Sequence, residues 1–255
     1  MMSLPYSRKT YFDGIAFEDM GIVVERVHDD LPEARDVMTQ MGRGSRFESS
    51  SLGEREIRLE CRAYEDEWQD FEELKDRLYP ILFTGDERKL QLRNHSDQYY
   101  MAHYKSFAEG DRIGATGVGA FELTFVASDP ARYGQERVYV YKGTNQQHFD
   151  LGGTADATDM RITIRNPRTA STKYSDEKNV LKLVINGNGL ILPKESVGVS
   201  DIVIDVHDRS VLGGIGPVGV TLASHWPSLS PGRWNVQLEV GSCDTITFQW
   251  KQRYL

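Results

Sequence analysis

The chain has 255 residues and a mass of 29.0 kDa, enough for one large domain or two smaller ones, each with a buried core. Hydrophobic residues make up 39% and charged residues 27% of the sequence, and these fractions exclude a disordered chain and a coiled coil. The net charge of −8 disfavours a protein built to bind nucleic acid, because such proteins present a basic face to the phosphates.

The cysteines and the N-terminal segment indicate where the protein is made. Cys61 and Cys243 lie far apart and form neither a disulfide framework nor a metal-binding CxxC pair, so we expect free thiols in a reducing compartment. The first residues, MMSLPYSRKT, lack the apolar stretch of a secretory signal, and no run approaches the ~20 apolar residues of a membrane helix. We therefore expect synthesis in the cytoplasm and no membrane insertion.

The first half of the sequence shows the alternation that is typical of antiparallel strands. Residues 10–17 contain Asp13-Gly14, which supplies the positive φ angles of a two-residue turn, and they are predicted to form a hairpin. Residues 55–63 alternate strictly between apolar and charged side chains, which predicts a half-buried strand. Further strands are predicted at residues 89–93, 99–105 and 119–127.

One segment of this half has helical periodicity. From Trp68 onward the apolar residues recur at spacings of three and four, as on one face of a helix. Asp66 and Gln69 match the spacing of a capping box, and Glu65 and Glu67 favour the positive end of the helix dipole. Pro80 predicts either a kinked last turn or a helix that ends at Leu78 or Tyr79.

The second half shows no comparable helix and reads as a series of short strands. Asp129-Pro130 and the following Gly134 break the pattern, so we divide the chain into domains 1–134 and 135–255. Asn186-Gly187-Asn188-Gly189 is predicted to be a turn between strands, and the spacing of the strands predicts a β-sandwich or barrel. The strand candidates are residues 137–141, 160–164, 180–186, 190–192, 201–205, 218–222, 235–240 and 245–251.

We find no convincing catalytic, metal-binding or cofactor-binding residues in the sequence. Asp205, His207 and Ser210 resemble a fragment of a catalytic triad, but they are better explained as the polar rim of a hairpin, because no nucleophile elbow is present. The acidic residues between Glu65 and Glu73 are best explained as a solvated helix face. The glycines of residues 110–119 lack the lysine and helix of a phosphate-binding loop.

Two further patterns have a structural and a functional interpretation. Residues 137–142 interleave basic and aromatic side chains, as in single-strand nucleic-acid binders, but they also fit an ordinary strand, which we favour. Trp226 and Trp234 are candidates for stacking on a sugar ring, although packing in the core is the commoner role of such tryptophans.

The order of features resembles the distal tail protein (Dit) family of long, non-contractile-tailed phages. An early Tyr11-Phe12-Asp13-Gly14 hairpin is followed by a strand, a Gly42-Arg43-Gly44 turn, the alternating strand and the single helix. The first half then closes on a strand that ends in Asp129-Pro130. Residues 226–235, WPSLSPGRWN, are similar to the family's Trp-x-x-Leu-x-x-Gly-x-Asn loop before the last two strands.

This resemblance implies a mainly β protein, with an N-terminal tail-tube-like β-domain carrying one α-helix and a C-terminal galectin-like β-sandwich. It also implies a structural protein of the virion tail tip, without enzymatic activity, metal or cofactor. Six copies would form a ring at the distal end of the tail tube, as a baseplate hub for host adsorption, in one or two stacked rings. The implied partners are other copies of the chain, the tail tube protein, and tip and receptor-binding proteins, with DNA only passing through the lumen.

Within this implied ring we interpret residues 35–54 as an arm that reaches the adjacent subunit. The segment is polar and glycine-rich, has weak core patterning and precedes a strong strand. The alternative function is a lectin that attaches to the host surface through Trp226 and Trp234 in the C-terminal sandwich. The candidate arm residues are Arg35, Gly42, Arg43, Gly44, Arg46 and Phe47.

Overall fold

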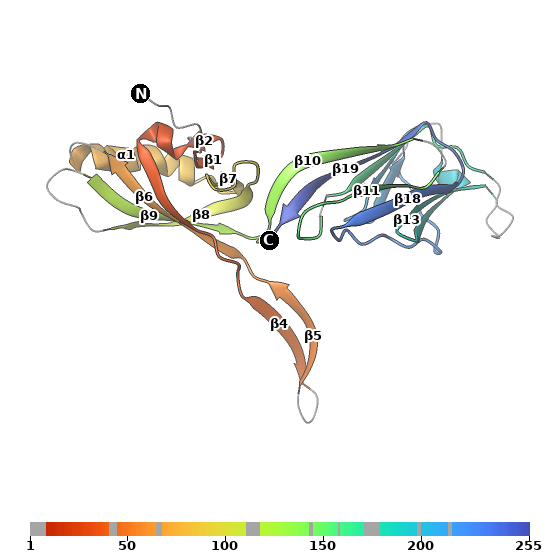
Figure 1. The fold of residues 1–255 in the computed structure, drawn as a ribbon, viewed down its shortest axis with the longest axis horizontal. Helices are drawn as coiled ribbons and strands as arrows, with labels where there is room; N and C mark the ends of the chain where they lie inside the picture. Colours follow the sequence, from red (N-terminus) through yellow and green to blue (C-terminus); the bar gives the residue numbers. More distant parts are fainter. Residues whose placement is uncertain are drawn as a thin grey trace. The chain divides into compact units, whose positions relative to one another are not determined.

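The computed structural model describes residues 9–40, 45–64, 68–110, 118–142, 145–157, 159–170, 179–197, 200–213 and 216–255. These residues form two compact units (Figure 1). The N-terminal unit extends to Tyr133 and includes Leu255, and the C-terminal unit runs from Gly134 to Tyr254. Antiparallel strands dominate both units, and α1 (Trp68–Leu82) is the α-helix of the described residues. The prediction of a mainly β protein with one helix is confirmed.

A seven-stranded antiparallel sheet with the order β2-β1-β7-β8-β9-β6-β3 forms the N-terminal unit. The predicted strands at residues 55–63 and 119–127 correspond to β6 and β9, and the predicted pair at 89–105 corresponds to β7 and β8. The elements are β1 (Tyr11–Phe12), β2 (Ile15–Ala16), the 3-10 helix η1 (Phe17–Met20), β3 (Ile22–His28), β6 (Arg55–Tyr64), β7 (Arg88–Gln91), β8 (Tyr100–Glu109) and β9 (Val118–Ala127).

The helix α1 covers one face of this sheet, and the core of the unit lies between them. Alternation along β6 and β9 directs every second side chain toward the helix, and these side chains are buried. Gly119 has a packing role here, because a Cβ at this position would lie 2.6 Å from the ring of Phe71 on α1. The buried positions are Ile57, Leu59, Cys61 and Ala63 on β6, Phe121, Leu123, Phe125 and Ala127 on β9, and Phe71, Leu74, Leu78 and Leu82 on α1.

The helix continues past the residues at which Pro80 was expected to end it. Leu82 is buried in the core, and Phe83 N–H donates to Tyr79 O at 2.9 Å, so the last turn forms around the proline. Of the two alternatives predicted for Pro80, an end of α1 at Leu78 or Tyr79 is therefore wrong, because tertiary burial outweighs the local cost of proline. The capping residues Glu65, Asp66 and Glu67 lie outside the described residues.

The two-residue turn predicted at Asp13-Gly14 is confirmed, whereas the turn predicted at residues 186–189 consists of Asn186 and Gly187 alone, because Asn188 and Gly189 belong to β14. Asp13 and Gly14 have φ angles of 49° and 83° between β1 and β2, and Asn186 and Gly187 have 49° and 81° between β13 and β14. Positive φ at both central positions gives a backbone twist that matches that of the flanking strands.

A separate two-stranded sheet, β4 (Ala34–Gln40) with β5 (Ser45–Leu52), extends from between β3 and β6. In Figure 1 this hairpin runs away from the sheet that carries β3 and β6. We call β4 and β5 the arm. The sequence indicated an arm within residues 35–54 but not that its strands pair with one another.

The C-terminal unit consists of a six-stranded sheet, β10-β19-β12-β15-β16-β17, and a four-stranded sheet, β11-β18-β13-β14, with a shared core of buried side chains. This arrangement is a β-sandwich. Its elements are β10 (Arg132–Tyr141), β11 (Gln147–Asp150), β12 (Arg161–Arg165), β13 (Val180–Ile185), β14 (Asn188–Pro193), the 3-10 helix η2 (Lys194–Ser196), β15 (Ile202–Asp205), β16 (Ser210–Gly213), β17 (Gly216–Pro217), β18 (Arg233–Val240) and β19 (Thr245–Tyr254).

Two features of this unit differ from the sequence-based expectation. Residues 218–222 are not a strand: Val218 N–H donates to Val211 O at 2.9 Å, whereas Thr221 N–H donates to Ile191 O at 3.0 Å. The segment therefore forms one backbone hydrogen bond to each of the two sheets and does not pair along either of them as a strand. In addition, β11 and β16 were missed, because strands of four residues are too short for a clear alternation.

A buried polar network lies where the arm leaves the N-terminal sheet. Arg55, the first residue of β6, is 2% exposed, and its Nη1 donates to Tyr100 Oη at 2.7 Å. Tyr100 Oη in turn donates to Asp29 Oδ2 at 3.0 Å, just after β3 ends. Burial is the main cause of the raised pKa of Tyr100, so its hydroxyl stays protonated and able to donate.

Substituting Tyr100→Phe should lower the free energy of unfolding by about 1–3 kcal/mol, because a buried arginine and a carboxylate lose their shared partner. Urea unfolding monitored by circular dichroism measures this change. Tyr11→Phe is the control, because the Tyr11 hydroxyl makes no hydrogen bond within the described residues. Equal stability of the two variants would contradict a structural role for the network.

Candidate functional site

The arm exposes apolar side chains on a hairpin that pairs with no other described strand. Every described side chain of β4 and β5 is exposed, and Val37 and Met38 are 50% and 56% exposed. The two strands are antiparallel, with Val37 opposite Ser49 and Met38 opposite Phe47, and a bulge separates these two pairs. An isolated hairpin is only marginally stable in water. Contact with another polypeptide would therefore stabilise the arm and bury its apolar side chains.

The structure places the predicted arm residues as follows. Arg35 lies on β4 with an exposed side chain. Its guanidinium packs close to Gly53, because a Cβ added to this glycine would lie 3.1 Å from the Nε of Arg35. Arg46 and Phe47 belong to β5, in register with Thr39 and Met38. Gly42, Arg43 and Gly44 lie outside the described residues.

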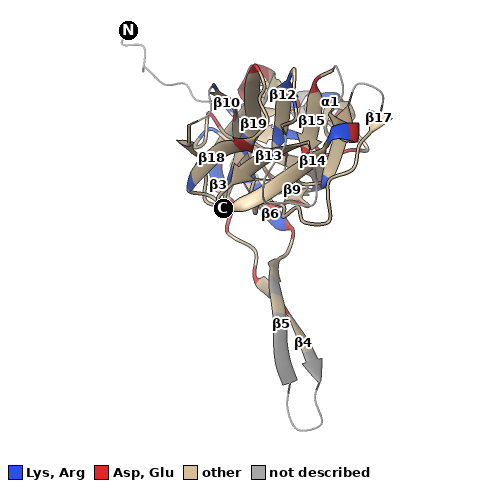
Figure 2. Cartoon of the chain, turned by 90° about the vertical axis from the view of Figure 1, so that its right-hand side faces the viewer, with Lys and Arg blue, Asp and Glu red and all other residues tan. Residues whose placement is uncertain are grey.

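The face of the N-terminal sheet turned away from α1 carries charges that neutralise one another. On β6, Glu56, Arg58, Glu60 and Arg62 alternate with the buried residues. Arg62 contacts Glu25 of β3 at 3.1 Å, and Lys105 of β8 contacts Glu56 at 2.5 Å. In Figure 2 acidic and basic segments are likewise interspersed along the chain. These described cations are each paired with a carboxylate, which leaves little basic charge on them to hold a polyanion.

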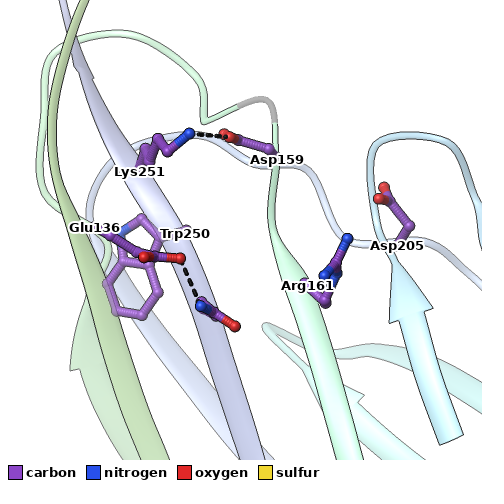
Figure 3. Close-up of a pocket in the computed structure, with 7 residues that line it drawn as sticks. Glu136, Asp159, Arg161, Asp205, Trp250 and Lys251 are labelled. Carbon is purple, nitrogen blue, oxygen red and sulfur yellow. Dashed lines mark hydrogen bonds and ion pairs between the residues drawn. The ribbon is translucent and has the colours of Figure 1, made fainter.

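A polar groove of about 200 Å³ lies on the six-stranded sheet of the C-terminal unit (Figure 3). Lys251 Nζ lies 3.5 Å from Asp159 Oδ2, and Gln249 Nε2 donates to Glu136 Oε1 at 2.5 Å. Most of its polar groups are thus already paired with one another. The lining residues are Glu136, Asp159, Arg161, Asp205, Gln249, Trp250 and Lys251.

The two tryptophans proposed for sugar stacking have different environments. Trp234 is 1% exposed, its ring centroid lies 5.9 Å from that of Phe149, and its Nε1 donates to Ser230 O at 3.3 Å. Its faces are covered by core side chains, so its assignment as a sugar platform has to be corrected. Trp226 is half-buried and packs against the edge of the same core. Trp234 is therefore a packing residue, whereas sugar stacking by Trp226 stays a prediction.

The structure gives the remaining sequence candidates structural roles. Asp205 ends β15, its Oδ1 accepts from Asp208 N–H at 3.0 Å, and it pairs in register with Ser210 of β16. These residues form the polar hairpin favoured from the sequence. No group of three or more potential metal ligands occurs among the described residues. Of the glycine-rich segment 110–119, residues 111–117 lie outside them.

No helix in the described part of the chain has the length and apolar character needed to cross a membrane. The thiol of Cys61 is buried, and burial raises its pKa, so it stays protonated and unreactive.

Comparison with known proteins places these features in a family context. Residues 23–127 match the family model of the phage tail protein RIFT-related domain, so the N-terminal unit carries this domain. Over 97% of this chain and 99% of the other, the structure superposes on the Dit protein of phage SPP1, gp 19.1, with a TM-score of 0.73 at 16% identity. The chain has the Dit fold. This match confirms, for the fold, the resemblance that the sequence motifs indicated.

The SPP1 Dit protein is described as a paradigm of the hub adsorption apparatus in phages that infect Gram-positive bacteria. Two structures of the phage P2 baseplate in its activated conformation, with Ca and with Sr, match 93% of this chain and 92% of theirs. Their identities are 11% and 12% and their TM-scores 0.41, which is too low to establish a shared fold. No protein with a curated description matches the sequence. The expectation of a structural tail protein, not an enzyme, agrees with the tail-domain and Dit matches.

Replacing Trp234 by alanine should destabilise the C-terminal unit by about 3–5 kcal/mol, as is usual for a buried aromatic side chain. Trp226→Ala should cost less than half of that, because Trp226 is only half-buried. Thermal unfolding followed by tryptophan fluorescence distinguishes the two variants. A negligible loss for Trp234→Ala would contradict its assignment to the core.

Proposed function

We propose that this protein is a structural hub of a phage tail tip, which forms a six-membered ring at the distal end of the tail tube. The exposed arm is the observation that carries this proposal, because its apolar side chains need cover from another polypeptide. The Dit fold and the phage tail domain support the same interpretation. Tail tube protein on one side and tip and receptor-binding proteins on the other are the expected partners.

The edges of the N-terminal sheet suit a ring. β3 is the last strand at one edge. At the other end of the sheet, β2, β1 and β7 are paired in turn, but within the described residues β7 covers β8 only at residues 100–102. The following part of β8, to Glu109, pairs with β9 alone among the described strands. Open edges invite pairing with another chain, and two different edges allow a head-to-tail contact that closes on itself.

We place the charged face of β6 toward the lumen of this ring, because α1 covers the opposite face. DNA in transit must pass without being retained, and a surface whose cations are paired with carboxylates has little affinity for phosphates. The net charge of −8 per chain has the same effect.

Removing the arm should convert the ring to single subunits. We expect the full chain to scatter light as a particle of 174 kDa, six times 29.0 kDa, and a variant with residues 34–52 replaced by a short Gly-Ser turn to scatter as one subunit. Circular dichroism would verify that the shortened protein is folded. A full-length chain that stays a lone subunit at high concentration, and does not associate with tail tube or tip proteins, would overturn the proposal.

Reversing charge on the β6 face should make the ring retain DNA. Glu56→Lys with Glu60→Lys exposes unpaired cations, and we expect a gel shift of duplex DNA that weakens steeply between 50 and 200 mM salt, on the order of 10³-fold for six or more phosphate contacts. Glu195→Lys with Glu239→Lys is the matched control, with the same change of charge in the C-terminal unit. DNA binding by both double variants would contradict the lumenal placement.

A further inference from the structure

An exposed aromatic patch lies where α1 ends over β8. Phe83, directly after the helix, is 67% exposed, and Tyr79 is 37% exposed. The rings of Tyr79 and Phe83 have centroids 5.8 Å apart, and Phe83 lies edge-on to Tyr104 at 5.1 Å. Phe107 stands 6.5 Å from Tyr79 and, like Tyr104, is only partly buried. We call Tyr79, Phe83, Tyr104 and Phe107 the aromatic patch.

This patch has a composition that is typical of protein–protein interfaces. Phe83 sits at the margin of the core with most of its ring in water, which costs free energy that burial would recover. Clustered aromatic residues are enriched at the centres of protein–protein interfaces. Partial desolvation by its neighbours already raises the pKa of Tyr104.

The arm and the aromatic patch lie on different sides of the N-terminal sheet. The arm connects β3 to β6, the last two strands at one edge in the order β8-β9-β6-β3. Tyr104 and Phe107 belong to β8, and register pairs them with Phe125 and Leu123 of β9, two strands away from β3. A head-to-tail ring requires two such different surfaces, one on each side of every subunit.

We propose that the arm of one copy docks on the aromatic patch of the next copy. This inference rests on the proposed ring and names the surface that receives the arm. Val37 and Met38 would pack against Phe83 and Tyr79, so that exposed aliphatic and aromatic side chains cover one another. The arm is long enough, because seven or eight strand residues at about 3.3 Å each span more than 20 Å.

The size of the contact is adequate for a stable assembly. A standard interface uses roughly 20–30 residues a side. The two arm strands have 7 and 8 residues, and the open edge of β3 adds 7 more on the same side of the subunit. The surface presented by one copy therefore reaches the lower end of that range, and it includes the exposed side chains of Val37 and Met38.

Cysteine cross-linking of the full chain tests the contact directly. Cys243 is replaced by serine, Cys61 stays because its thiol is buried, and Val37→Cys is combined with Phe83→Cys. Mild oxidation should give a ladder of disulfide-linked species up to six copies that reductant collapses to one band. Each single cysteine variant, and Val37→Cys with Leu222→Cys at a fully exposed site of the C-terminal unit, should give no ladder.

Serine substitutions give a second measurement that does not depend on thiol geometry. Val37→Ser and Phe83→Ser should each raise the concentration at which the ring dissociates at least tenfold, without lowering the melting temperature of the subunit, because both side chains are exposed. Because both side chains belong to the same contact, their effects should not add: the double variant should dissociate at about the same concentration as the weaker single variant. Mass photometry over a dilution series gives these values.

The outcomes separate this inference from the proposed ring. An intact ring that forms no ladder and tolerates Phe83→Ser would overturn the docking of the arm on the aromatic patch but leave the ring standing. A protein that forms no ring under any condition would overturn both.

Discussion

A hairpin of two strands cannot bury its own side chains, and in this protein that constraint applies to the arm. A third strand or a covering helix would supply what is missing, but among the described strands β4 and β5 pair only with each other. Val37 and Met38 consequently remain in contact with water. Cover from another polypeptide would remove these side chains from water, and this is the contact on which the proposed ring rests.

The two faces of the N-terminal sheet differ in what they contact. One face packs against α1 and holds the apolar core, whereas the other carries charges in mutually neutralising pairs. Exposed ion pairs of this kind add little to stability. Their consequence is electrostatic: on the described strands these cations are paired with carboxylates, which is compatible with the lumenal placement that we propose.

Sequence patterns predicted the elements whose determinants are local. Strict alternation in residues 55–63 located β6, and Asn186-Gly187 located the turn of β13 and β14. Elements that depend on distant contacts were predicted less well. The burial of Leu82 keeps α1 intact past Pro80, and residues 218–222 form hydrogen bonds to both sheets instead of a strand. The paired strands of the arm escaped prediction because neither face is buried, so no alternation exists. The aromatic patch was missed because periodicity cannot distinguish an exposed Phe83 from a core residue, and the burial of Trp234 required the three-dimensional packing.

The hydrogen bonds at the root of the arm have a mechanical consequence. Arg55 and Asp29 flank the two chain segments that enter and leave the arm, and Tyr100 of β8 joins them. Tension on the hairpin would be borne first by these short-range polar bonds, which give way over small displacements, and not by the apolar packing beneath α1. Through Tyr100 the base of the arm is thus linked to β8, and a load on the arm would reach a strand that is not its neighbour in sequence.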